Sequence, residues 1–208
     1  MRGFALGVLL FLAVPAFANG NTSQHHACRQ PRGTKLLASN AQLRAWLRTA
    51  KAQGYPGTFR SIVTVCAPPD GREHQLLNET ASVTGVRFDG AVIGFAAKIS
   101  NQYTEAQALH VGEADGRQLL GTSVENWPLG RQQPTPGFDG YAIDATGDVA
   151  WVETNANGTA GTGETLFAKA AAGPKQTLAT GEKISQLAFA KGALSWADDG
   201  SSASAPFG

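Results

Sequence analysis

The residues of this sequence that could do chemistry are a scattered set of acids and one arginine. A hydrolase or lyase acting on a glycan or an ester would use such groups as general acid and base. The candidates are Glu105, Glu113, Glu125, Asp139, Glu153 and Arg87. No spacing pairs two of them, and no Gly-x-Ser-x-Gly, His-Glu-x-x-His, phosphate-loop or dinucleotide-binding motif is present. We therefore expect a non-enzymatic binding protein, with an enzyme whose site lies on a fold axis as the alternative.

The histidines and one oxygen-rich turn do not predict a metal site. His25 and His26 are adjacent in a polar segment that imposes no ligand geometry, so we expect exposed side chains there. His74 and His110 fall on predicted strands at non-equivalent repeat positions. Residues 144–148 (DATGD) space three oxygen side chains as calcium loops do but lack the later bidentate acid, which favours a simple turn. We expect neither a metal ion nor another cofactor.

The only two cysteines, Cys28 and Cys66, favour one disulfide, because an even pair in an exported chain is normally oxidised. Closing that loop would stabilise the fold by about 3–4 kcal/mol in the chain-entropy view. The alternatives are two free thiols, or a metal pair completed by His25 and His26.

The first eighteen residues have the pattern of a secretory signal peptide. Met1 and Arg2 provide the positive start, residues 3–14 are apolar, and residues 16–18 (AFA) fit the cleavage site. This run is shorter than the roughly 20 residues of a membrane-spanning helix, and no second run follows. We expect an exported chain without a membrane span, in which residues 19–33 form a flexible lead-in to one domain.

The charge balance argues against a nucleic-acid partner. The formal net charge is +1, and this count includes Arg2 in the predicted signal peptide. The mature chain is therefore close to neutral and has no basic surplus for a nucleic-acid groove.

Two patterns alternate along the domain at 34–208. The first is an apolar hairpin with a glycine turn and a following leucine, at 63–77, 109–120 and, more weakly, 166–178. The second is a Gly or Asp turn followed by a short apolar strand with an aromatic residue. The aromatic residues are Phe95, Trp151 and Trp196, and the strands should place Val92, Val149 and Leu194 equivalently.

The spacing of these patterns predicts the fold. Gly71 and Gly116 are 45 residues apart, as are Trp151 and Trp196, and a Pro-rich inserted loop at 124–138 explains the longer gaps between them. Four strands in about 45 residues is the size of a propeller blade. We predict an all-β, propeller-like stack of about four small antiparallel sheets. The blades would span 34–80, 81–123, 139–181 and 182–208.

Two features of the stack stay open. Residues 40–53 fit a helix with Asn40 as its cap, but they also fit a strand in which Trp46 matches Phe95, as the repeat requires. The last repeat offers three strands, so Lys35–Ser39 could complete it and close the ring. An open stack and closure through a second copy are the alternatives.

The cadence of Asp-Gly-Arg with a following Leu-Leu (70–77 and 115–120), then Gly-x-Val-x-Trp (147–151), resembles the TolB-type and WD40-like β-propellers of exported bacterial proteins. Cys28 and Cys66 with the ending 194–200 (LSWADDG) are similar to small secreted bacterial proteins without an assigned function. The resemblance implies a propeller but carries over no catalytic residue.

Loops held by such a scaffold are the predicted binding elements. Trp127 in the inserted loop, and Asn155 and Asn157 in the Gly-rich segment 155–163, are the candidates. A protein or an envelope glycan is the expected partner, and association through free sheet edges is a further possibility.

Overall fold

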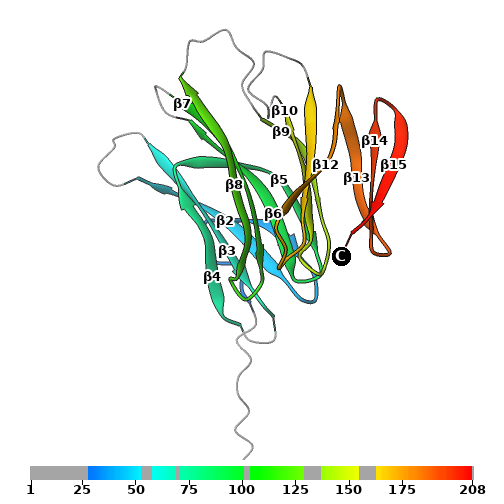
Figure 1. Cartoon of the computed structure of the whole chain (residues 1–208). Coiled ribbons are helices and arrows are strands. Elements are labelled where there is room, and N and C mark those ends of the chain that lie inside the picture. Colours follow the sequence, from blue (N-terminus) through cyan, green and yellow to red (C-terminus); the bar gives the residue numbers. More distant parts are fainter. Residues whose placement is uncertain are drawn as a thin grey trace, which may run out of the picture.

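The computed structural model describes residues 28–52, 58–68, 71–100, 104–128, 137–154 and 163–207. Within these ranges the chain forms fifteen strands in four antiparallel sheets and no helix (Figure 1). The predicted all-β stack of small sheets is therefore confirmed. The predicted signal peptide, most of the lead-in, and His25 and His26 lie outside the described residues.

Every sheet is a meander in which each strand pairs with its neighbours in the chain. The first sheet contains β1 (Thr34–Ser39), β2 (Arg44–Lys51), β3 (Phe59–Cys66) and β4 (Glu73–Glu79). The second contains β5 (Ala81–Asp89), β6 (Val92–Ser100), β7 (Thr104–Glu113) and β8 (Gln118–Pro128). The third contains β9 (Gly137–Ile143), β10 (Val149–Thr154), β11 (Glu164–Lys169) and β12 (Lys175–Gly181). The fourth contains β13 (Ile184–Ala190), β14 (Ala193–Asp198) and β15 (Ser201–Pro206).

The structure decides two features that the sequence left open and corrects one expectation. Within 40–53 the strand that the repeat requires is confirmed and the alternative helix is wrong, because Arg44–Lys51 pairs with β1 and β3 as strand β2. Residues 35–39 pair with β2 in the first sheet, so they do not complete the fourth sheet, and the stack of described sheets is open. The segment at 124–138 is a loop only in part, because β8 continues to Pro128 and β9 begins at Gly137.

In the second, third and fourth sheets, an aromatic residue on the second strand packs towards the preceding sheet. Phe95 contacts the first sheet beside Val63 and Leu77. Trp151 packs against the second sheet, and Trp196 against the third. A single small sheet cannot cover both of its apolar faces, so each sheet serves as the cover for the next. The predicted register of Phe95, Trp151 and Trp196 agrees with this packing.

The expected equivalence of Val92 with Val149 and Leu194 is wrong by one residue. Val92 faces the third sheet, whereas Ile93 faces the first sheet as Val149 and Leu194 face their preceding sheets. The reason is the turn before the strand. Gly90 is the first of its two turn residues, whereas Gly192 is the second, so alignment on the glycines shifts the register.

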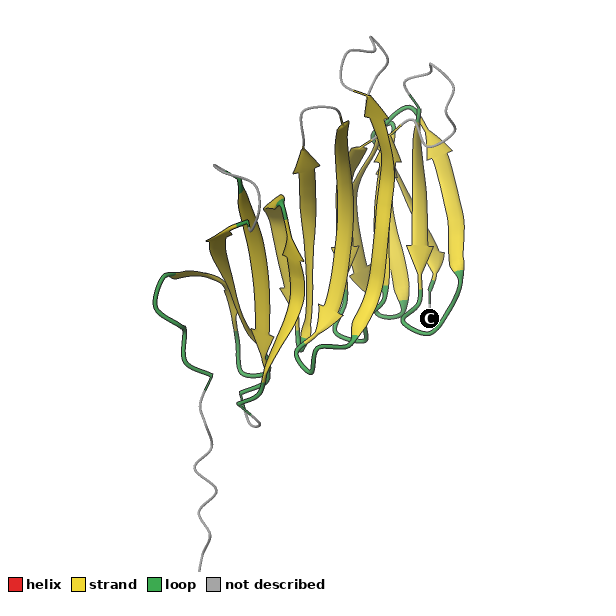
Figure 2. Cartoon of the chain, turned by 90° about the vertical axis from the view of Figure 1, so that its left-hand side faces the viewer, coloured by secondary structure: helices red, strands yellow, loops and turns green. Residues whose placement is uncertain are grey.

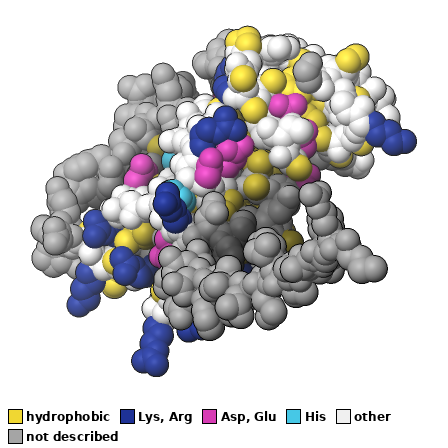
Figure 3. Space-filling view, turned by 90° about the horizontal axis from the view of Figure 1, so that it is seen from below, with side chains coloured by type: hydrophobic (Ala, Val, Ile, Leu, Met, Phe, Trp, Pro, Cys, Tyr) yellow, Lys and Arg dark blue, Asp and Glu magenta, His cyan; other side chains and the backbone are white. Residues whose placement is uncertain are grey.

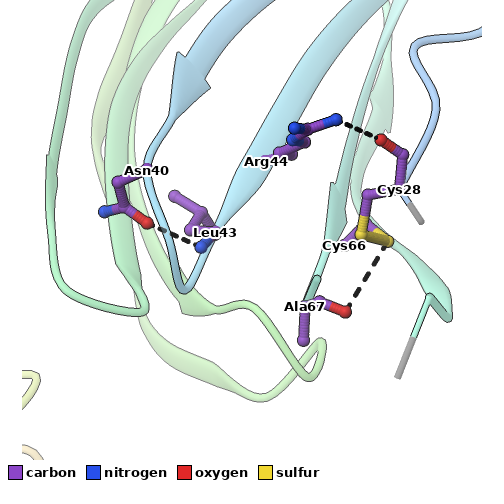
Figure 4. The surroundings of a disulfide bond; sticks show 6 residues. All are labelled: Cys28, Asn40, Leu43, Arg44, Cys66 and Ala67. Atoms are coloured by element: carbon purple, nitrogen blue, oxygen red, sulfur yellow. Dashed lines mark hydrogen bonds between the residues drawn. A yellow bond between two sulfur atoms is a disulfide. The ribbon is translucent and has the colours of Figure 1, made fainter. Parts of the chain in front are cut away.

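The first sheet has no preceding sheet, and a disulfide-bonded segment takes that place. Trp46, which corresponds to Phe95, is 2% exposed because it packs against the disulfide between Cys28 and Cys66. Arg44 donates from Nη1 to the Cys28 carbonyl at 2.7 Å, which holds the incoming chain on β2 (Figure 4). The predicted disulfide is present, and it caps one end of the stack.

The sheets lie side by side in chain order (Figure 1), and their strands run in similar directions (Figure 2). Their first strands, β1, β5, β9 and β13, meet one another from sheet to sheet along a common axis. No helix in the described part of the chain is long and apolar enough to cross a membrane.

Candidate functional site: the axial groove

The first strand of each of the four sheets contains a β-bulge. Each bulge breaks the register with the second strand of its own sheet. The bulged residues are Leu37 in β1, Gly85–Val86 in β5, Asp139 in β9 and Gln186–Leu187 in β13. A bulge leaves backbone groups unpaired and redirects side chains, so it is a common device beside binding and active sites.

A groove of about 490 Å³ runs between β5, β9 and β13. Its apolar wall consists of partly exposed side chains from all three strands, with Phe88 43% exposed. The main contributors are Val86, Phe88, Ile143, Leu187 and Phe189. Exposed rings that line a concavity are the usual contact surface for a ligand's apolar part.

A second, more polar hollow of about 260 Å³ shares Arg87 and Leu187 with the first one. Asp139, Ser185 and Gln186 contribute polar groups to its wall. Because the two hollows share residues, we treat them together as the axial groove. On the face of the molecule seen from below, Lys, Arg, Asp and Glu side chains lie among hydrophobic ones (Figure 3).

Tyr141 contacts both the bulge of β5 and the Arg87 side chain. The Tyr141 hydroxyl donates to the Gly85 carbonyl that the bulge leaves free, and the Arg87 guanidinium lies 5.4 Å from the ring centroid. A Cβ on Gly94 would sit 2.7 Å from the same ring, so only glycine allows this approach. Burial raises the pKa of Tyr141, which keeps its hydroxyl a donor. In the described part of the chain Arg87 has no carboxylate partner.

Two carboxyl groups meet behind the polar end of the groove. Asp139 is exposed at its bulge and hydrogen-bonds to Glu164, which is 8% exposed. Glu164 Oε2 also accepts a hydrogen bond from the Ile184 backbone N–H at 2.5 Å. Burial raises the pKa of Glu164, and the charge of Asp139 adds to the rise, while the bond from Ile184 opposes it. At a pH near the ordinary pKa of a glutamate, Glu164 therefore retains its proton more readily than a free glutamate does.

At each of the three junctions between neighbouring sheets, which we call seams, one residue of the third strand forms a side-chain hydrogen bond with the backbone of the next sheet. This residue occupies the same position in all three strands. Ser61, Gln107 and Glu164 each lie two residues before a buried aliphatic residue: Val63, Leu109 and Leu166. Ser61 Oγ donates to the Ala81 carbonyl at 2.5 Å, and Gln107 Oε1 accepts from the Phe138 N–H at 3.1 Å. We call these three residues the seam clasps. Glu164 thus has a structural role, and it is the one titratable clasp.

The acids predicted from the sequence are dispersed. Glu113 binds Arg117 in an exposed hairpin, at 2.6 Å. Glu153 accepts from Trp151 Nε1 at 2.7 Å and from Lys175 at 3.2 Å. The side chains of Glu105 and Glu125 are not described. Among the predicted groups whose side chains are described, only Arg87 and Asp139 line the groove together.

The predicted loop residues lie largely outside the described structure. Asn155 and Asn157 belong to that undescribed part. Trp127 was expected on a loop, but it lies in β8 opposite Glu105, and its side chain is not described.

The histidine and turn predictions fall on described strands and turns. His74 lies in β4, and His110 stacks on Phe95 in β6 with 5.3 Å between the ring centroids, where burial lowers the pKa of the imidazole. Asp144 Oδ1 accepts hydrogen bonds from the Thr146 and Asp148 N–H groups, which is the geometry of a turn.

Sequence reasoning missed Tyr141, Gln186 and Glu164. The signal for Glu164 was present, because a polar residue recurs two positions before a buried aliphatic residue in three third strands. The signal for Gln186 was absent, because a bulge in a strand without a glycine looks like regular alternation.

No known family profile and no curated protein sequence matches this chain. A search of solved structures finds the crystal structure of the tricorn protease, with a TM-score of 0.38 and 8% sequence identity. The match covers 83% of this chain and 20% of that protein, so the chain spans about a fifth of its length.

Proposed function

We propose that this protein is an exported, non-enzymatic binding module that holds its ligand in the axial groove. The observation that supports this is that the groove is lined both by an exposed ring, Phe88, and by Arg87, which lacks a carboxylate partner among the described residues. A guanidinium in a concave apolar wall suits a ligand that carries an apolar group next to an acidic or hydrogen-bond-accepting group.

Export agrees with the disulfide and with the predicted signal peptide, since disulfides persist in oxidising compartments. A protein or an envelope glycan remains the proposed partner, and the segments 124–138 and 155–163 remain a second proposed contact surface. Kinship with TolB-type or WD40-like propellers is part of the proposal and rests on the repeat pattern.

The test compares groove variants with matched variants elsewhere on the surface. The mature chain is screened against peptides and envelope-glycan fragments, and affinities are measured by biolayer interferometry. We expect Arg87→Gln and Phe88→Ser to weaken any captured ligand by at least about tenfold, or about 1.4 kcal/mol. Arg72→Gln and Phe59→Ser, which change exposed residues outside the groove, should bind like the wild type.

Equal losses in both pairs of variants would show that the groove is not the binding site. The alternative function, a hydrolase or lyase, would use Asp139 with Glu164. Turnover of a captured glycan or ester that Asp139→Asn abolishes would replace the binding proposal.

A further inference from the structure

The fourth sheet ends at its third strand, β15, whereas in the other three sheets a fourth strand pairs with the third. In those sheets the third strands β3, β7 and β11 pair outwards with β4, β8 and β12. β15 is the corresponding third strand, because Phe207 N donates to the Gly192 carbonyl as Ala114 N donates to the Ala91 carbonyl, both at 2.9 Å. In the described part of the chain no strand covers β15, which forms the margin of the molecule (Figure 1).

The backbone groups that β15 presents outwards can be assigned from its pairing. β15 pairs with β14 without a register shift, and Phe207 directs its N–H towards β14. Backbone polarity alternates along a strand, so Ser201, Ala203 and Ala205 also point towards β14. Ser202 and Ser204 therefore present their N–H groups to the open side. Pro206 also faces that side but has no N–H to offer.

This edge lacks most of the devices that keep strands apart. An exposed edge normally carries charges, bulges or prolines that prevent pairing with another chain. The outermost strands of the other sheets have such devices, because β4, β8 and β12 are all bulged against their neighbours. The residues of β15 (SSASAP) are small and uncharged, and only Pro206 at its end is protective.

We propose that β15 pairs antiparallel with β15 of a second copy of this chain, about a two-fold axis at Ala203. In that register Ser202 of each copy lies opposite Ser204 of the other, and both pairs exchange two N–H to carbonyl hydrogen bonds. All outward N–H groups of the strand are then used, and Pro206 lies beyond the paired region. Two three-stranded sheets become one continuous sheet of six strands.

The side chains suit this register. Ala203 faces its own copy at a non-hydrogen-bonded position, where Cα atoms approach to about 4.5 Å and a small side chain is required. The serines, both exposed, face each other across the junction and can exchange hydroxyl hydrogen bonds. In a two-fold contact the same strand supplies both sides, so β15 alone can form this interface. Because the interface is small, we expect a weak dimer that forms at high protein concentration.

The experiment is sedimentation equilibrium of the mature chain over a wide concentration range. The wild type should dimerise, and Ser204→Pro, which removes an outward N–H without touching the β14 ladder, should raise the dissociation constant by at least about tenfold. Ser204→Ala, which keeps that N–H, should dimerise like the wild type. Thermal unfolding establishes that each variant is folded.

A charge-exchange pair keeps the test decisive if the proline variant does not fold. A variant with Ser202→Glu and Ser204→Glu places glutamates opposite glutamates at both junctions, and Ser202→Lys with Ser204→Lys does the same with lysines. Each variant alone should be monomeric, and a mixture should form the heterodimer. A wild type that remains monomeric, or a dimer that is indifferent to all these changes, would overturn the proposal. Binding of a synthetic strand such as Lys175–Gly181 by a monomeric wild type would assign the edge to a different partner.

Discussion

At the scale of single residues, the seams between sheets are joined by three different chemistries at one repeated position. A hydroxyl at Ser61, an amide at Gln107 and a carboxyl at Glu164 each bind the backbone of the next sheet. A buried polar contact of this kind contributes about 1 kcal/mol, and an unsatisfied partner costs more. Only the contact at Glu164 changes with protonation.

This difference predicts a pH-dependent contribution to stability from Glu164. Its pKa is raised in the folded state above the ordinary value of 4.5, so the folded protein binds this proton more tightly than the unfolded chain. The contribution is complete below the ordinary pKa and is lost as pH rises through the folded pKa. We expect Glu164→Gln to gain stability relative to the wild type between pH 4 and pH 7, measured by urea unfolding.

The reciprocal variant is the control for this prediction. Gln107→Glu places a carboxyl at the equivalent clasp, so the second and third sheets should acquire the pH dependence that Glu164→Gln removes. A constant difference between wild type and Glu164→Gln across this pH range would contradict the assignment.

At the scale of elements, bulges distinguish the first strand of each sheet from a regular strand. Gly85 and Gln186 occupy the same bulge position and have φ values of 59° and 56°. This left-handed conformation is free of strain for glycine and costs other residues about 1–2 kcal/mol. The side chain at Gln186 is therefore held beside the groove against a local conformational cost.

The bulge geometry makes a stability prediction of opposite sign at the two positions. We expect Gly85→Ala to destabilise the protein by about 1–2 kcal/mol, because a Cβ there has room, with Tyr141 3.8 Å away, but the backbone is strained. Gln186→Gly should instead be neutral or stabilising by up to about 1 kcal/mol. Chemical unfolding measures both. Gly140→Ala is the control, since it has open space and no positive φ, and a loss there as large as at Gly85 would refute the explanation.

The strands themselves could be predicted from the sequence, whereas the bulges could not. Apolar alternation and glycine turns mark strands because burial on one face has a period of two. The 45-residue repeat then selected a strand over a helix at Trp46, where local periodicity alone was ambiguous. A bulge at Asp139 or Gln186 changes the register by one residue and leaves that alternation almost intact. Arg87 and Asp139 could therefore be named as candidates from the sequence, but the bulges that shape the groove around them could not be predicted.

At the scale of the whole molecule, the disulfide caps one end of the open stack of sheets. The disulfide between Cys28 and Cys66 spans 38 residues and covers Trp46, which would otherwise face solvent. We expect Cys28→Ser with Cys66→Ser to lose about 3–4 kcal/mol of stability in the chain-entropy view. The tryptophan fluorescence of this double variant should shift to longer wavelength, because Trp46 becomes exposed.

Trp46→Phe in both backgrounds provides the control for that shift. If Trp46 is the residue that the disulfide covers, the spectra of the Trp46→Phe proteins with and without the disulfide should coincide. A shift that persists after Trp46→Phe would place the effect elsewhere in the stack.

Because the order of the sheets in space is their order in the chain (Figure 1), the sheets can fold one after another from the N-terminal end. Residues 28–79 contain both cysteines and the whole first sheet, so the disulfide can form before the later sheets fold. Each later sheet can then pack on a sheet that is already folded, because no sheet needs a strand from a later part of the described chain. Construction of this kind proceeds in one direction, and it keeps the exposed apolar area at any moment to about one sheet.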